Sequence, residues 1–275
     1  MNHKIILNGL SASILAVTFI LQTAQAEVPI LETDIQSNST YLMAQYTAAT
    51  IKQDFSNRDS SVVENTDMNI SELDLVHSGS KMGSVIPLIS MGATFYDIED
   101  EEKYADFNIK AGLAIETGNK RHLFYADYDV RQEGYRDTIE IGAVLRATDV
   151  DNVKTGLELE LSAALQEGTD TTSGGHSYTV STNAKAMLNS KWFVTGQFLF
   201  GLQTDTEFND GSYVESGPAV GAELGLAFQA HENLQFKGSI YSSFQNNEYY
   251  TSNSDYFLTD DQTLTGVGLV MTLDI

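Results

Sequence analysis

Cysteine is absent from this chain of 275 residues, and proline occurs only three times. Without cysteine the chain can form no disulfide and offers no thiolate for catalysis or metal binding. Basic residues are also scarce, because 15 Lys and Arg stand against 38 Asp and Glu and leave a formal net charge of −23. Contacts with phosphate need Lys and Arg, so this balance argues against nucleic acid as a partner and is compatible with cations.

Long apolar runs are missing as well, apart from one at the N-terminus. Lys4 precedes a mostly apolar segment, residues 5–21, and the small-residue sequence Ala24-Gln25-Ala26 follows it. This order is typical of a secretory signal peptide with its cleavage site. We therefore predict that residues 1–26 are a signal peptide removed on export and that residues 27–39 form a periplasmic lead-in. No later stretch of about 18 apolar residues could form a membrane-spanning helix.

Alternation of apolar and polar residues dominates the rest of the chain. Between Ala105 and Glu116 the apolar side chains occupy the odd positions, and polar or small residues occupy most of the even positions. A helix would need a period near 3.6, whereas a period of 2 places every second side chain on the same face of a strand. Segments of roughly ten such residues, separated by turns, have the length that a tilted membrane strand needs.

About twelve segments of this kind follow one another from residue 40 to residue 275. The second alternates poorly, so ten strands remain an alternative. Short turns, such as Thr117–Lys120, alternate with longer polar loops, such as Asp54–Met68 and Asn246–Gln262. This rhythm is typical of exported barrels. The fold class that we predict is all-β, a single antiparallel up-and-down transmembrane β-barrel of residues 40–275. The segments start near Thr40, Asn69, Ser84, Tyr104, Arg121, Thr138, Val153, Ser177, Trp192, Gly217, Leu234 and Thr263.

The last segment carries a more specific signal. In residues 266–275, apolar side chains that include Met271, Leu273 and Ile275 alternate with small or polar residues that include Gly268. This segment resembles the closing strand of the outer-membrane β-barrels of Gram-negative bacteria, although that strand usually ends in an aromatic residue. The resemblance implies an outer-membrane location after export through the periplasm. It also implies insertion by the barrel-assembly machinery through the C-terminal strand, contact with outer-membrane lipid and lipopolysaccharide, and closure between the first and last strands.

A cluster of charges occupies the polar face of three consecutive segments. If that face lines a water-containing interior, its acids form a wall that favours cations, as charged side chains do in channels. The alternative is a neutralising network with neighbouring bases across a narrow interior filled by side chains. The acids are Asp127, Asp129, Glu140, Glu158 and Glu160, and the bases are Arg131, Arg146 and Lys185.

These features favour a porin-like diffusion channel for small cationic or neutral solutes. A second reading is a plugged structural barrel that acts through its outer loops. A third is an outer-membrane hydrolase, for which His176, next to Ser177 in a glycine-containing loop, is the one candidate. Because no further residues complete a catalytic group and no His or Cys set has metal-binding spacing, we expect no enzyme activity, no cofactor and no metal.

Overall fold

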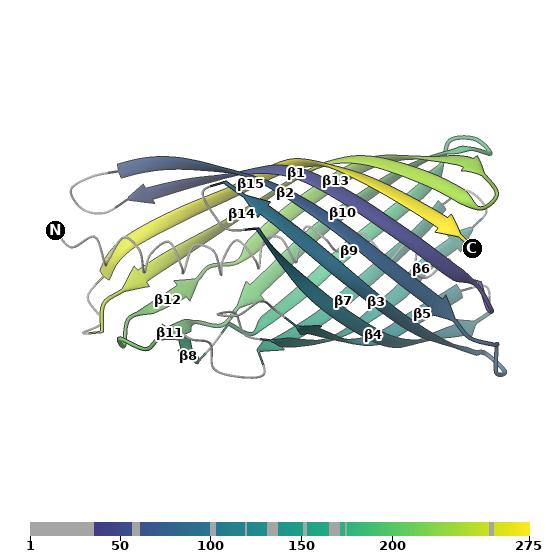
Figure 1. Cartoon of the computed structure of the whole chain (residues 1–275), viewed down its shortest axis with the longest axis horizontal. Helices are drawn as coiled ribbons and strands as arrows, with labels where there is room; N and C mark the ends of the chain where they lie inside the picture. Colours follow the sequence, from purple (N-terminus) through teal and green to yellow (C-terminus); the bar gives the residue numbers. More distant parts are fainter. Residues whose placement is uncertain are drawn as a thin grey trace.

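Twelve antiparallel strands close into a barrel in the computed structural model (Figure 1). The predicted signal peptide and most of the predicted lead-in lie outside the residues that the structure describes. Those residues are 36–56, 61–99, 103–118, 120–130, 137–150, 153–164, 171–173, 175–252 and 256–275. The barrel strands are β1 (Thr40–Ser56), β2 (Ser61–Ser78), β3 (Val85–Ile98), β4 (Tyr104–Thr117), β5 (Lys120–Val130), β6 (Thr138–Val150), β7 (Val153–Ala164), β9 (Ser177–Met187), β10 (Trp192–Gln203), β13 (Ala219–His231), β14 (Leu234–Tyr250) and β15 (Tyr256–Asp274).

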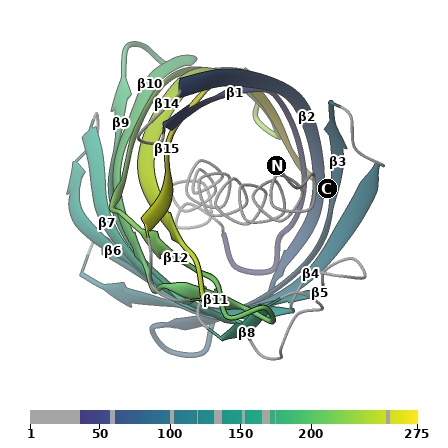
Figure 2. The same cartoon turned by 90° about the vertical axis from the view of Figure 1, so that its left-hand side faces the viewer.

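Each barrel strand pairs with the strands that precede and follow it, and the first pairs with the last. The seam between β1 and β15 runs from the pair Tyr41 and Asp274 to the pair Ser56 and Thr259. Figure 2, viewed along the barrel, shows the strands arranged around the ring. Closure leaves no long edge strand, which is how a barrel satisfies its backbone groups in lipid. The predicted up-and-down barrel is confirmed with twelve strands, and the ten-strand alternative is wrong.

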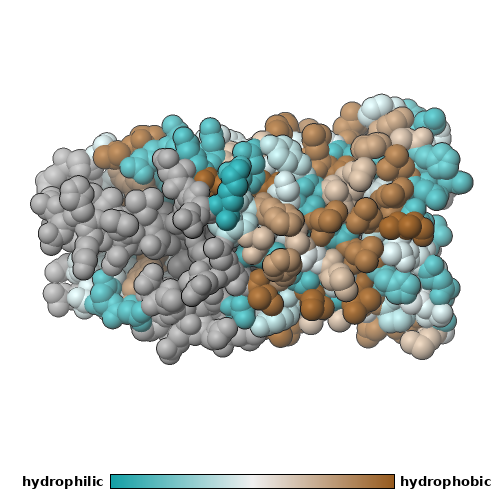
Figure 3. All heavy atoms as spheres, viewed as in Figure 1, coloured by the Kyte–Doolittle hydropathy of each residue, from teal (hydrophilic) through white to brown (hydrophobic). Residues whose placement is uncertain are grey.

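The outer surface of the barrel is apolar. Ile109 on β4 is 55% exposed and Ile141 on β6 is 56% exposed, while their neighbours in sequence turn toward the interior. Figure 3 shows apolar residues across one face of the wall, with polar residues gathered at the short-turn end. An apolar surface of this extent fits a lipid environment and not a water-soluble monomer. Among the described residues, no helix is long and apolar enough to cross a membrane. Further members of this apolar belt are Leu73, Met91, Phe124, Leu159, Phe198, Leu224, Ile240 and Leu269.

Two of the predicted long loops are mostly strand. β1 continues to Ser56 and β2 starts at Ser61, so the predicted loop Asp54–Met68 shrinks to a short connection. Likewise β14 reaches Tyr250 and β15 starts at Tyr256 inside the predicted loop Asn246–Gln262. These hairpins lie at the left-hand end of the barrel in Figure 1. Polar side chains occupy both faces of the strands there, as Gln53 and Asp54 do on β1, so the apolar alternation fades although the backbone pairing continues.

Three short strands enlarge the rim at this long-loop end. β12 (Tyr213–Ser216) pairs with β14, β11 (Thr206–Phe208) pairs with β12, and β8 (Thr171–Ser173) pairs with β11. The rings of Tyr213 and Tyr250 stack across the first of these pairs, with centroids 4.8 Å apart. The rim is therefore built from ordered strand pairs as well as connecting loops.

Candidate functional site

The five predicted acids lie on the inner face of three adjacent strands. Asp127 on β5 is the register partner of Glu140 on β6, and Gly142 on β6 is the partner of Glu160 on β7. Alternation along each strand turns these side chains inward, and Asp127 is only 5% exposed. The structure therefore brings together the carboxylates that the sequence placed on one face.

Tyr125 connects two of these acids. Its hydroxyl lies 3.1 Å from Oε1 of Glu158 and 2.9 Å from Oε2 of Glu160, so its single proton can be donated to either carboxylate. The ring reaches them by crossing Gly142, where a Cβ would stand 2.1 Å from Cζ of Tyr125. Ser181 on β9 donates a further hydrogen bond of 3.0 Å to Glu158. Neutral donors thus hold this pair of carboxylates in place.

Lys110 on β4 is the base at the centre of the acidic wall. Its Nζ lies 3.5 Å from Oδ2 of Asp127 and 4.7 Å from the centroid of the Tyr125 ring. A single ammonium shared among several carboxylates offsets only part of their mutual repulsion. The Lys110 ammonium also attracts the carboxylates of Glu72, Glu140 and Glu160 electrostatically.

Two acids on β2 belong to the same wall and were not singled out from the sequence. Glu72 and Asp74 face inward, whereas Leu73 between them is exposed on the lipid side. The side chains of Asp74 and Asn108 meet above Gly92 of β3, where a Cβ would lie 2.0 and 2.3 Å from their oxygens. The acidic wall consists of Glu72, Asp74, Asp127, Asp129, Glu140, Glu158 and Glu160.

The predicted basic partners lie closer to the short turns than the acids do. Arg146 is near the end of β6, where its backbone N–H donates to Nδ1 of His122 over 3.2 Å. Lys185 is near the end of β9, with its Nζ 4.7 Å from the ring centroid of Phe193. Arg131 lies outside the described residues. The charges are therefore graded along the barrel, with bases toward the short turns and acids farther along the strands.

A salt bridge elsewhere on the inner wall joins one base to one acid, so the pair carries no net charge. Nζ of Lys237 on β14 lies 2.6 Å from Oε1 of Glu223 on β13. Another charged group joins two short turns, where Glu116 accepts hydrogen bonds from Lys81 and from Arg121. The Lys81 ammonium first, and then the Arg121 guanidinium, hold the pKa of Glu116 below its ordinary value.

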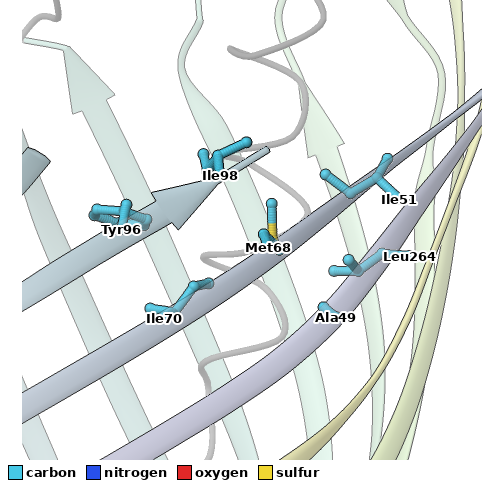
Figure 4. Packing of buried hydrophobic residues seen from close by; sticks show 7 residues of the cluster. All are labelled: Ala49, Ile51, Met68, Ile70, Tyr96, Ile98 and Leu264. Atoms are coloured by element: carbon cyan, nitrogen blue, oxygen red, sulfur yellow. The ribbon is translucent and has the colours of Figure 1, made fainter. Parts of the chain in front are cut away.

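Toward the long-loop end the inner wall becomes apolar across the seam and on the strands that follow β1. Seven buried residues from β15, β1, β2 and β3 pack together there, and Figure 4 shows their side chains on one stretch of wall. We call this group the apolar cluster. It consists of Ala49, Ile51, Met68, Ile70, Tyr96, Ile98 and Leu264.

The ring of the catalytic candidate His176 gains no partner for catalysis among the described residues. Its backbone N–H donates to Oγ1 of Thr204 over 3.0 Å, and its side-chain Nδ1 has no hydrogen-bond partner. Within the part of the chain that the structure describes, no hydrogen bond joins its ring to an acid or a nucleophile, and no group of His, Cys, Asp and Glu could hold a metal ion. The arrangement that a hydrolase needs is therefore not assembled among these residues.

Comparison with known proteins yields similarity of structure only. No family model and no curated protein matches the sequence. An outer-membrane channel from Pseudomonas putida F1 superposes with a TM-score of 0.65 at 9% identity, over 88% of this chain and 97% of that chain. The translocator domain of the autotransporter NalP from Neisseria meningitidis gives a TM-score of 0.51 at 12% identity, over 94% and 97% of the two chains. Together with the closed barrel and its apolar belt, these likenesses show that the chain has the fold of the outer-membrane β-barrels.

Proposed function

We propose that this protein is a porin-like channel of the Gram-negative outer membrane through which small cationic or neutral solutes diffuse. The observation that carries the proposal is the acidic wall, in which seven carboxylates share the inner face of a closed barrel with Lys110. The likeness in fold to an outer-membrane channel supports it. The signal-peptide pattern of residues 1–26 supports export to that membrane.

The physical basis of selection is the field of the wall. Charged side chains on a narrow passage raise the local concentration of ions of opposite sign and lower that of ions of the same sign. Because the acids outnumber the base at their centre, the wall should attract cations and repel anions. A neutral solute would pass according to its size alone.

The proposal is tested by electrical recording. The mature protein is reconstituted in a planar bilayer, and the reversal potential is measured under a KCl gradient. We expect steady conductance with a preference for K⁺ over Cl⁻. Replacing three acids together, as Asp127→Asn, Asp129→Asn and Glu158→Gln, should shift the reversal potential toward zero while conductance persists.

A matched control removes the same number of charges away from the inner wall, as Asp54→Asn, Glu232→Gln and Asp261→Asn. This variant should keep the reversal potential of the natural protein. A barrel that is folded, as judged by heat-modifiable migration in electrophoresis, and yet never conducts would contradict the channel function.

A structural or surface-interaction barrel is the second candidate. The observation that favours it is the enlarged rim, where β12, β11 and β8 continue the sheet and Tyr213 stacks on Tyr250. A barrel acting through this surface would be silent in the same recording. The electrical experiment therefore separates the two functions.

A further inference from the structure

A group of amide and carboxyl side chains lies at the long-loop end of the seam. Gln245 on β14 pairs in register with Gln262 on β15, and Asn247 pairs with Asp260. Gln262 is also the register partner of Gln53 on β1. All five are buried on the inner face, beyond the last outward apolar residue of β14. We call them the outer polar cluster.

Hydrogen bonds occupy most of the N–H and O–H donors in and beside this cluster. Oδ2 of Asp260 accepts from Nε2 of Gln262 over 2.6 Å and from Nε2 of Gln53 over 3.2 Å. Tyr249 donates to the same oxygen over 3.5 Å, and Nε2 of Gln245 donates to the carbonyl oxygen of Gly217 over 3.2 Å. One carboxylate oxygen thus collects most of the available N–H and O–H groups.

The oxygens that remain have no partner among the described residues. They are Oε1 of Gln245, Oδ1 of Asn247, Oδ1 of Asp260 and Oε1 of Gln262. The unpaired groups beside them that can donate are fewer, Nδ2 of Asn247 and the hydroxyl of Ser243. The four residues that carry the unpaired oxygens are 0% exposed. Because unpaired buried acceptors are costly, a surface with an excess of them is complementary to a ligand rich in donors.

Apolar surface adjoins these acceptors. Leu264 is the next inward residue after Gln262 on β15, and Ile51 is the next after Gln53 on β1. Both belong to the apolar cluster, whose side chains continue onto β2 and β3 (Figure 4). The wall therefore changes from oxygen acceptors to apolar side chains within one step along two neighbouring strands.

We propose that the outer polar cluster and the apolar cluster together bind the ammonium head and the apolar body of alkylammonium solutes. An ammonium has three donors and no acceptor, which matches the free oxygens of Asp260 and the amides. The single carboxylate supplies the opposite charge and makes a charge-assisted hydrogen bond. This proposal rests on the proposed channel function and names a class of solute for it.

The chemistry of the cluster disfavours other ligands. Divalent cations such as Ca²⁺ are usually held by several carboxylates, whereas Asp260 is the only one in this cluster. Anions would meet unpaired oxygens and no base within the group. A polyhydroxylated solute would need donors for its own oxygens, and it would gain little from the apolar side chains beside them.

The test uses hexylammonium as a probe in single-channel recordings of the mature protein, added to each side in turn. We expect brief interruptions of the K⁺ current whose frequency rises with probe concentration, and none with hexanol or hexanoate. Asp260→Asn should weaken this block about tenfold, because a charge-assisted hydrogen bond is lost. Asp261→Asn is the matched control, since Asp261 is the next residue and contacts Asn246 on the other face.

Further variants distinguish binding of the ammonium head of the solute from binding of its apolar body. Ile51→Ser should weaken block by hexylammonium and leave any weak block by methylammonium unchanged. If Asp260→Asn does not fold, Asn247→Leu removes an acceptor without touching the charge and should weaken block by hexylammonium. Block that is equal in the Asp260→Asn and Asp261→Asn channels, or that hexanol reproduces, would overturn the proposed subsite.

Failure of the subsite remains distinguishable from failure of the channel. Conductance and the reversal potential in KCl are recorded on the same protein before the probe is added. If the folded barrel does not conduct, binding of hexylammonium is measured by titration calorimetry in detergent. Heat of binding that Asp260→Asn abolishes would then support the subsite in the absence of a channel, and no heat would refute it.

Discussion

Gly142 shows how a single residue can organise the acidic wall. Its missing side chain lets the ring of Tyr125 cross β6 and reach Glu158 and Glu160 on β7. Two acids that lie one inward position apart on the same strand repel each other, and the shared hydroxyl can donate its one proton to either of them. At this scale, the positions of the carboxylates depend on a glycine that carries no functional group.

Gly142→Ala should therefore disturb both packing and selectivity. The new methyl group would lie 2.1 Å from Cζ of Tyr125, so the ring must leave its place. We expect a loss of about 1–3 kcal/mol in the free energy of unfolding, as for other overpacked sites, measured by urea titration in lipid vesicles.

Two comparisons separate the steric effect from the loss of the hydroxyl. Tyr125→Phe removes the hydrogen bonds without the clash and should destabilise less. Gly196→Ala is the control, since its nearest heavy atom would lie 3.8 Å away, an ordinary contact. Equal stability of the Gly142→Ala and Gly196→Ala variants would mean that the crossing of Tyr125 over β6 has no energetic role.

At the scale of the strands, the sequence predicted the barrel wherever inside and outside differ in polarity. β4 and β7 alternate cleanly, so their bounds and their inward acids could be read directly. The pattern of β2 predicts a strand only weakly, because its inward face carries Met68 and Ile70 from the apolar cluster, while polar residues face outward beside them. The phase of the alternation therefore changes along β2, and Glu72 and Asp74 were overlooked.

The partners of the acids could not be predicted, because they depend on register. Alternation assigns a side chain to a face, but a shift of two residues keeps the face and changes the neighbour. The approach of Tyr125 to Glu158 crosses an intervening strand, and it also requires a glycine at one position of that strand. No local pattern in the sequence carries this information.

The seam between β1 and β15 should be sensitive at its last residues. The backbone N–H of Ile275 donates to the carbonyl oxygen of Thr40 over 2.8 Å, and Leu273 is the register partner of Leu42. We predict that Ile275→Asp lowers the assembled fraction of the barrel severalfold in cells, whereas Ile275→Phe maintains it. Heat-modifiable migration in electrophoresis measures the assembled fraction.

Refolding of the same variants into lipid vesicles distinguishes two causes of a lower assembled fraction. If Ile275→Asp refolds normally in vesicles but not in cells, Ile275 acts in recognition by the barrel-assembly machinery, as the resemblance of the last segment implies. A defect in both settings would instead place its role in closing the seam. Normal assembly of this variant in cells would contradict the prediction.

At the scale of the whole molecule, the barrel holds different chemistry at successive levels. The outer polar cluster and the apolar cluster lie toward the long loops, the acidic wall lies farther in, and bases such as Arg146 and Lys185 lie near the short turns. A solute entering from the long-loop end would meet oxygen acceptors and apolar surface before the main concentration of negative charge. This order fits a cation that is captured first and then drawn inward.

Selectivity that arises from the acidic wall should weaken with salt. The Debye length falls from about 10 Å at 0.1 M to about 3 Å at 1 M, so the field of the carboxylates reaches less of the passage at high ionic strength. We expect the preference for K⁺ over Cl⁻ to be strong when the KCl gradient is centred near 0.1 M and to decline toward 1 M. Lys110→Gln should increase this preference, because it removes the ammonium that lies 3.5 Å from Asp127. Lys52→Gln, at an exposed lysine on the outer face of β1, should leave the preference unchanged. A preference that is the same at both salt concentrations would contradict selection by the field of the acidic wall, because that field is screened by salt.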